Sequence, residues 1–225
     1  MIDLVISHYN EDLKWLNHVN KLNIRKIFIY SKYNSDQNHA GIRQKNLNKK
    51  FESNEYYTEL SDKIKKIKSP NIGRESETYL RYCFEQYNAD VEGVVFLQGQ
   101  PHVDIRIVNS WIEQISSKRP YTDNYKKLDL YNMLTDGKLK NWYGNCNQSK
   151  YNCFTWLRTY VDSELYPYRI KTYLNAEFGV AKKFIKTRPR LYYLDLIHKE
   201  LMNSNPESAH FFERLWFYIF NCHKL

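Results

Sequence analysis

The sequence has little of what marks secreted, membrane-spanning or zinc-binding chains. Its 225 residues include only four cysteines, with no CxxC pair, and no segment reaches the roughly 18 apolar residues that a membrane span needs. Residues 1–16 show no cationic stretch leading into a long apolar run, as a secretory leader would. We therefore expect a soluble chain with no membrane span, located in the cytoplasm, or in the host cytoplasm if its source is a virus.

The sequence also lacks any segment with the composition of an interdomain linker. The chain has seven glycines and six prolines, and no Pro/Gly/Ser-rich stretch divides it. With 42% hydrophobic and 16% aromatic residues it has ample material for a core, unlike disordered proteins. We expect one domain over residues 1–225.

The four cysteines are expected to be free thiols. They lie far apart, and Cys83 falls on the apolar face of an expected helix. Cys146 and Cys153 share a loop-like stretch where pairing or metal binding stays open, although their spacing matches no zinc signature.

Positive charge is in excess, with a formal net charge of +9. Such a charge attracts phosphate-bearing partners, which include sugar nucleotides, nucleic acids and anionic surfaces. Much of it lies in dispersed lysines, as an AT-rich genome would also produce, so charge alone does not choose among these partners.

Short β-branched runs alternate with helical patterns along the first half of the chain. Residues 2–7, 24–30 and 93–97 are expected to form buried strands. Apolar residues at helical spacing follow the first and the last of these strands, at Leu13, Leu16, Val19, Leu22 and at Ile105, Val108, Ile112, Ile115. This alternation predicts an α/β fold with a mainly parallel central sheet flanked by helices.

The remaining segments are less regular. Residues 31–55 are expected to be loop, and a loop around Asn71 and Gly73 leads into a helix. Residues 117–175 are aromatic and irregular, which suits either an acceptor-binding region or ordinary packing. The last fifty residues are expected to be helical, with Pro189 restarting a helix and an apolar terminal helix packing on the sheet.

Six landmarks resemble, in order, an uncharacterised family known only as a domain of unknown function. They are VISHYNEDLKWL, IFIYSK, SPNIGRESETYL, VVFLQGQP, AEFGVAKKFIKTRPRLYY and FFERLWFYIF, and they cover most of the chain. That family is in turn similar to nucleotide-diphospho-sugar transferases of the GT-A fold. The resemblance implies a nucleotide-binding half at residues 1–116 and an acceptor-side, helical half at residues 117–225.

The resemblance also implies a divalent cation, Mn²⁺ or Mg²⁺, on the diphosphate of a UDP- or GDP-sugar. GT-A enzymes hold that metal with an Asp-x-Asp motif, which is absent here. In its place stands QGQPHVD, so only His102 and Asp104 are candidate metal ligands. Two alternatives stay open: that the protein works without a metal, and that it is inactive.

Three polar loops are expected to meet beyond the carboxyl ends of the strands, where open α/β sheets bind ligands. An arginine beside a glycine at a helix start suits a phosphate, and the polar loop after the first strand suits a base and ribose. Each has a structural alternative, a helix cap at Asn10 and an Arg74–Glu75 surface pair. The candidate ligand-binding residues are His8, Tyr9, Asn10, Glu11, Asn71, Gly73, Arg74, Gln98, Gly99, Arg188 and Arg190.

Three carboxylates are candidates for the general base of a sugar transfer. Glu213 is flanked by apolar residues in FFERLW, and a carboxylate so placed can take a proton from an acceptor hydroxyl. A buried Glu213–Arg214 pair is the structural alternative. Asp104 and Glu177 are the rival bases.

Together these features predict a glycosyltransferase that moves a sugar from a nucleotide-diphosphate sugar to a hydroxyl on a glycan, protein or lipid. The alternatives are an inactive module that binds a nucleotide or glycan, and a basic nucleic-acid-binding protein. The last has no recognised motif, so nucleic acid is the less favoured partner.

Overall fold

The computed structural model describes residues 1–33, 60–129, 146–165 and 169–224. The chain forms two compact units, and neither coincides with residues 1–116 or 117–225. The sheet unit comprises Met1–Asn71, Ala89–Thr122 and Glu177–Lys183. The helical unit comprises Ile72–Asn88, Asp123–Ala176 and Phe184–Leu225.

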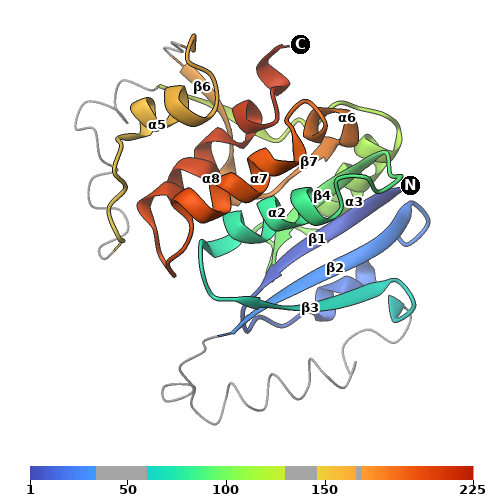
Figure 1. The fold of residues 1–225 in the computed structure, drawn as a ribbon. Coiled ribbons are helices and arrows are strands. Elements are labelled where there is room, and N and C mark those ends of the chain that lie inside the picture. Colours follow the sequence, from blue (N-terminus) through green and yellow to red (C-terminus); the bar gives the residue numbers. More distant parts are fainter. Residues whose placement is uncertain (34–59, 130–145, 166–168, 225) are drawn as a thin grey trace. The chain divides into compact units, whose positions relative to one another are not determined.

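A five-stranded sheet organises the sheet unit (Figure 1). Its strands are β1 (Ile2–His8), β2 (Ile24–Tyr33), β3 (Ile64–Pro70), β4 (Gly93–Gln98) and β7 (Phe178–Ala181), in the order β3-β2-β1-β4-β7. The first four are parallel, and β7 is antiparallel to β4. The prediction of an α/β fold with a mainly parallel sheet is confirmed.

The strand order reverses beside β1. The chain adds β2 and β3 on one side of β1 and then returns to add β4 on the other side. The neighbouring strands end together, since His8 is in register with Ser31 and Ser7 with Gln98. Ligands of open α/β sheets bind at such a switch point, outside the carboxyl ends of the strands.

Helix α3 (Ile105–Ser116) covers one face of this sheet. Its apolar residues recur three and four positions apart, so Val108, Ile112 and Ile115 lie on one side and are buried. They pack with alternate residues of β1 and β4 in a single core cluster. The predicted helix over this segment is confirmed.

The helix expected after the first strand is much shorter than its spacing suggested. Leu13, Leu16 and Val19 are buried, but the only helical turn is the 3₁₀ segment η1 (Lys14–His18), and Leu22 is 83% exposed. The chain is already extended at Val19, and the Asn109 side chain accepts a hydrogen bond from the next backbone N–H, that of Asn20. That bond draws the segment away from a further turn.

Four of the described strands escaped the sequence analysis: β3, β7 and the two strands of a smaller sheet, at Tyr125–Asp129 and Arg169–Tyr173. β3 carries Lys65, Lys66 and Lys68, which the sequence analysis counted as dispersed charge; among the described residues it pairs with β2 alone, at the edge of the sheet, where lysines are tolerated. β7 lies within the last fifty residues, so the prediction of helix throughout that stretch is wrong there. Gly179 brings β7 close to α3, because a Cβ at this position would lie 2.7 Å from Ile115.

The helical unit is built mainly from α2, α7 and α8 around a two-stranded sheet. As predicted, a helix follows Gly73 and another restarts directly after Pro189. The apolar terminal helix packs on β6 and α2. The elements are α2 (Arg74–Glu85), β5 (Tyr125–Asp129), α5 (Cys153–Tyr160), β6 (Arg169–Tyr173), η4 (Leu174–Ala176), α7 (Arg190–Glu200), α8 (Glu207–Ile219) and η5 (Cys222–Lys224), and α6 (Lys182–Ile185) lies where the two units meet along the chain.

Aromatic side chains fill the core of the helical unit. Trp216 packs on Tyr79, Phe212 and Phe220, and Trp156 meets Phe212 edge-on at a centroid distance of 4.8 Å. All four cysteines of the chain are free thiols, as expected.

Some expectations fall outside the described residues. Most of the expected loop at 31–55 and part of the aromatic stretch at 117–175 lie there. In the part of the chain that the structure describes, none of the helices combines the length and the apolar character needed to cross a membrane.

Candidate functional site

The loops that follow β1 and β4 meet at the switch point of the sheet. Their direct link is a hydrogen bond of 2.7 Å from the indole N–H of Trp15 to the carbonyl of Gly99. Trp15 also packs against the core beneath the loops. The two loops therefore form one surface at the carboxyl edge of the sheet.

His8, the last residue of β1, is buried, and both of its ring nitrogens have partners. Nε2 lies 3.2 Å from the carbonyl of Glu11, which can only accept, so Nε2 carries the proton and Nδ1 accepts from the Ser31 hydroxyl at 3.2 Å. Burial lowers the pKa of His8, although Glu11 partly opposes this. His8 is thus neutral at pH 7 and joins the ends of β1 and β2.

The Glu11 carboxylate is held by its own loop. One of its oxygens accepts from the backbone N–H groups of Tyr9, at 2.7 Å, and Asn10, at 3.1 Å. It lies against Gly99, where an added Cβ would be 2.3 Å from that oxygen. Asn10 is exposed and does not cap η1, whose N-cap is Leu13 without a side-chain cap, while Asp12 accepts from the Lys14 N–H at 2.9 Å in the turn before it.

A buried carboxylate holds the loop after β4. Glu177, immediately before β7, is 1% exposed and accepts from the backbone N–H of His102 through both oxygens, each at 3.1 Å. The Nδ1 of the half-exposed His102 ring lies 3.4 Å from the same carboxylate. Burial raises the pKa of Glu177, while hydrogen bonds from His102 and the backbone of Gln98 oppose the shift. Buried carboxylates whose pKa is raised beside a charge partner are enriched at functional sites, and structural pairs show the same shift.

Asp104 begins α3 and is bound to Arg106. One oxygen accepts from the Arg106 backbone N–H at 2.8 Å, and both oxygens accept from its guanidinium, at 2.9 and 3.2 Å. These bonds lower the pKa of Asp104. The carboxylate thus serves as a helix cap with an exposed ion pair.

The residues expected to hold a metal do not fit a divalent cation as they lie. Asp104 faces Arg106, whereas His102 turns Nδ1 to Glu177. Across the described ranges, no three His, Cys, Asp or Glu side chains converge on a point where an ion could sit.

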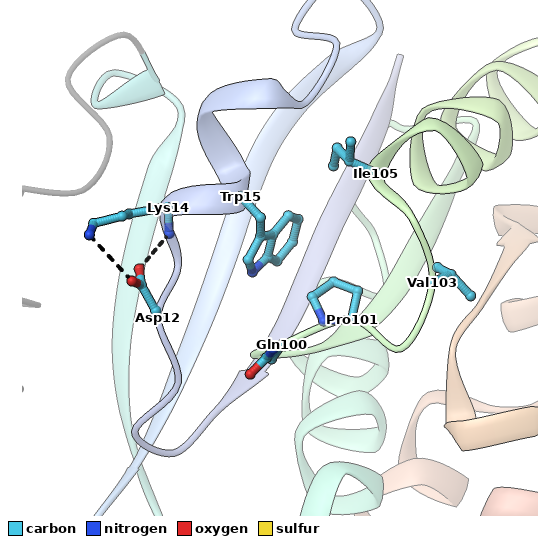
Figure 2. Close-up of a pocket in the computed structure, with 7 residues that line it drawn as sticks. All are labelled: Asp12, Lys14, Trp15, Gln100, Pro101, Val103 and Ile105. Atoms are coloured by element: carbon cyan, nitrogen blue, oxygen red, sulfur yellow. Dashed lines mark hydrogen bonds and ion pairs between the residues drawn. The ribbon is translucent and has the colours of Figure 1, made fainter.

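A pocket of about 280 Å³ opens between the two loops (Figure 2). The sequence analysis named none of the lining residues as site residues, although several are neighbours in the chain of residues that it did name. The available signal for Trp15 was a large aromatic residue just after the first strand's polar loop. The lining residues are Asp12, Lys14, Trp15, Gln100, Pro101, Val103 and Ile105.

The Gly73–Arg74 pair of the helical unit starts α2 in left-handed backbone, with φ of 60° and 52°. The N–H of Gly73 donates to the carbonyl of Asn203, and its Cα faces Leu201. The guanidinium of Arg74 lies 3.6 Å from Glu75, so the pair of the structural alternative is present, but Glu75 is buried and the pair is not a surface pair. Asn71 is half-buried at the end of the preceding segment of the sheet unit.

The two arginines around Pro189 bond to backbone carbonyls within the helical unit. Arg188 donates to the carbonyls of Ile219 and Tyr218, and Arg190 donates to that of Phe84. Each guanidinium also lies over an aromatic ring, that of Tyr192 or of Phe84. Arg188 thus binds backbone carbonyls at the carboxyl end of α8, and Arg190 binds one at the carboxyl end of α2.

Glu213 belongs to a polar cluster on α8. It lies 3.4 Å from Arg214 and 3.8 Å from the ring of His210, which is buried. Burial alone would raise the pKa of Glu213, but the hydrogen bond from His210 and the charges of Arg214 and Arg74 outweigh it, so the net shift is downward. This resembles the structural Glu–Arg pair considered as the alternative.

The predicted residues therefore divide between the units. The sheet unit gathers His8, Tyr9, Asn10, Glu11, Gln98, Gly99, His102, Asp104 and Glu177 at one sheet edge, while Gly73, Arg74, Arg188, Arg190 and Glu213 belong to the helical unit. The pairing of Glu177 with His102, 75 positions apart, had no sequence signal. In comparisons with known proteins, no family model matches the chain, and no curated protein matches it.

Proposed function

We propose that the chain is a glycosyltransferase with a GT-A-like sheet, which moves a sugar from a nucleotide-diphosphate sugar to a hydroxyl acceptor. The observation that carries the proposal is the Glu177–His102 pair at the switch point of a mainly parallel sheet. There a histidine oriented by a buried carboxylate shares a surface with an open pocket.

In this proposal His102 is the general base and Glu177 positions it. With Nδ1–H donating to Glu177, the lone pair of the ring stands on Nε2, and the carboxylate stabilises the imidazolium that forms. The acceptor oxygen attacks the anomeric carbon, its proton passes to Nε2, and the bond to the diphosphate breaks with the electron pair leaving on the diphosphate. Glu177 replaces Glu213 and Asp104 as the favoured carboxylate because those two pair with arginines.

Thermal shift with UDP, GDP, CMP and their sugar conjugates, with and without Mn²⁺, is the first test, since a ligand of the native state raises stability by mass action. We expect one nucleotide class to raise the melting temperature, and donor hydrolysis or transfer to follow with that donor. The variant Glu177→Gln should retain nucleotide binding and lose turnover. Absence of both binding and turnover across the panel would overturn the proposal.

A second candidate function is binding of a nucleotide or glycan without turnover. It is favoured by the engagement of Asp104 with Arg106, which leaves no Asp-x-Asp-like pair of carboxylates at the end of β4. Tight nucleotide binding by a wild-type protein that neither hydrolyses nor transfers the sugar selects this function.

A further inference from the structure

The pocket at the switch point has room for one small ring. Its volume of about 280 Å³ falls just below the roughly 300–1,000 Å³ of pockets that enclose drug-sized ligands. A complete sugar nucleotide, with base, ribose, diphosphate and sugar, exceeds that space. One ring of a larger ligand fits it.

One wall of the pocket is apolar and built around an aromatic face. The indole N–H of Trp15 is already bonded to Gly99, so this side chain offers its ring surface to a ligand. Pro101, Val103 and Ile105 extend the wall. The face of an aromatic ring carries negative charge density and attracts polarised C–H groups, which the faces of a pyranose ring present.

The rim of the pocket is polar but carries no net charge. In Figure 2 the Asp12–Lys14 pair lies to the left of Trp15 and Gln100 below it, and the Asp12 carboxylate is 3.5 Å from the Lys14 ammonium. The two charges offset each other, which leaves little attraction for a phosphate. The exposed amide of Gln100 both donates and accepts, and the Asp12 carboxylate accepts, as a ring bearing several hydroxyls requires.

We propose that this pocket binds a neutral pyranose ring of the acceptor, stacked on Trp15, so that the acceptor is a glycan. The inference deepens the proposed function and rests on it for the role of acceptor. A nucleobase also stacks on an indole, but the diphosphate attached to it would then lie at the rim, which carries no net charge to attract it. The pocket-lining Pro101 and Val103 flank the proposed base His102 in the chain, so both belong to one loop, although the His102 ring itself turns to Glu177 and does not line the pocket.

Saturation-transfer NMR and titration of the full chain with methyl glycosides of glucose, galactose, mannose and N-acetylglucosamine test this site without any donor. We expect at least one glycoside to bind. The variant Gln100→Ala should weaken that binding about three- to tenfold, the loss of one hydrogen bond, and Trp15→Ala should abolish it. Asn88→Ala, which removes an exposed amide in the helical unit, is the matched control and should change nothing.

Because Trp15 also packs on the core, circular dichroism must show that its variant is folded, and Gln100→Ala carries the test if it is not. Glycoside binding lost in Gln100→Ala supports the pocket even if no nucleotide binds, in which case the transferase proposal fails alone. Nucleotide binding that Gln100→Ala weakens, without any glycoside binding, overturns the pyranose site and leaves the transferase standing. No binding of either ligand overturns both.

Discussion

Glu11 and Glu177 of the sheet unit differ from Glu77 and Glu213 of the helical unit in the kind of donor they bind, although each unit also holds a carboxylate of the other kind, Asp104 with Arg106 and Glu207 with the backbone N–H of Ser149. In the sheet unit, Glu11 and Glu177 accept from backbone N–H groups of the loops after β1 and β4. In the helical unit, Glu77 and Glu213 pair with arginine side chains of their own helices. A carboxylate bound to backbone donors fixes the course of a loop, whereas the helices already have their backbone groups satisfied. Of these four carboxylates, the two in the sheet unit thus fix the loops of the crevice, and the two in the helical unit are held by side chains of their own helices.

The largest effect should come from His102→Asn, which removes the proposed base at the crevice. We expect turnover to fall by roughly 10²- to 10⁴-fold, the usual contribution of general-base catalysis. The melting temperature should barely change because the ring is half-exposed. His198→Asn, at an exposed position of α7, is the control and should retain full turnover. Equal turnover in the two variants would show that His102 is not the base, and the contrast between the two units would then concern structure alone.

A smaller but purely structural loss is expected from Gly73→Ala in the helical unit. Gly73 has φ of 60°, and the new Cβ would lie 2.7 Å from the Cβ of Leu201 and 2.8 Å from that of Glu77. Both atoms are fixed to packed backbone, so we expect a loss of about 2–5 kcal/mol in the free energy of unfolding. Denaturant titration measures it, and a loss below about 1 kcal/mol would contradict the prediction.

Gly99→Ala, the corresponding change in the sheet unit, should cost less. The nearest atoms to its Cβ belong to the Glu11 carboxylate, which can swing away by giving up its two backbone hydrogen bonds. We expect a loss of roughly 1–3 kcal/mol. In the double variant with Glu11→Ala the second substitution should cost little more, and strict additivity of the two losses would show that Glu11 does not mediate the effect.

The smallest effect is a dependence of stability on pH through His8. Its pKa is lowered in the folded state, so folding favours the neutral form. The stabilisation is present above the unfolded value of 6.5 and is lost as the pH falls through the folded pKa. His8→Gln should flatten the unfolding free energy over this window, and Glu11, which faces the ring, must be tested alongside it. An unchanged pH profile in His8→Gln would assign the dependence to another group.

Strong periodic patterns made the central strands and the main helices predictable. β1, β2 and β4 are apolar runs buried in the sheet, and the apolar side of α3 shows in its spacing. β3 was hidden because an edge strand tolerates lysines, and β7 because its four residues include a glycine. Both misses are decided by tertiary pairing, which local sequence does not encode.

The candidate site was predictable in place but not in its contacts. Strand ends located the polar loops correctly, since parallel strands finish at one edge of a sheet. The partners of the side chains in these loops were not predictable from the sequence. Asp104 accepts from Arg106, and Glu177 accepts from His102. Which donor a carboxylate meets depends on the path of the backbone between elements.

Because the indole N–H of Trp15 donates to the Gly99 carbonyl, the exchange rate of this one proton measures how often the crevice opens. That proton is held in the hydrogen bond while the loops after β1 and β4 stay together, and it exchanges more readily when they part. In heavy water its lifetime therefore counts loop openings, independently of the global unfolding that the buried amides of β1 and β4 report. A ligand that bridges the two loops lengthens this lifetime, so slower exchange of the indole proton reports that the site is occupied.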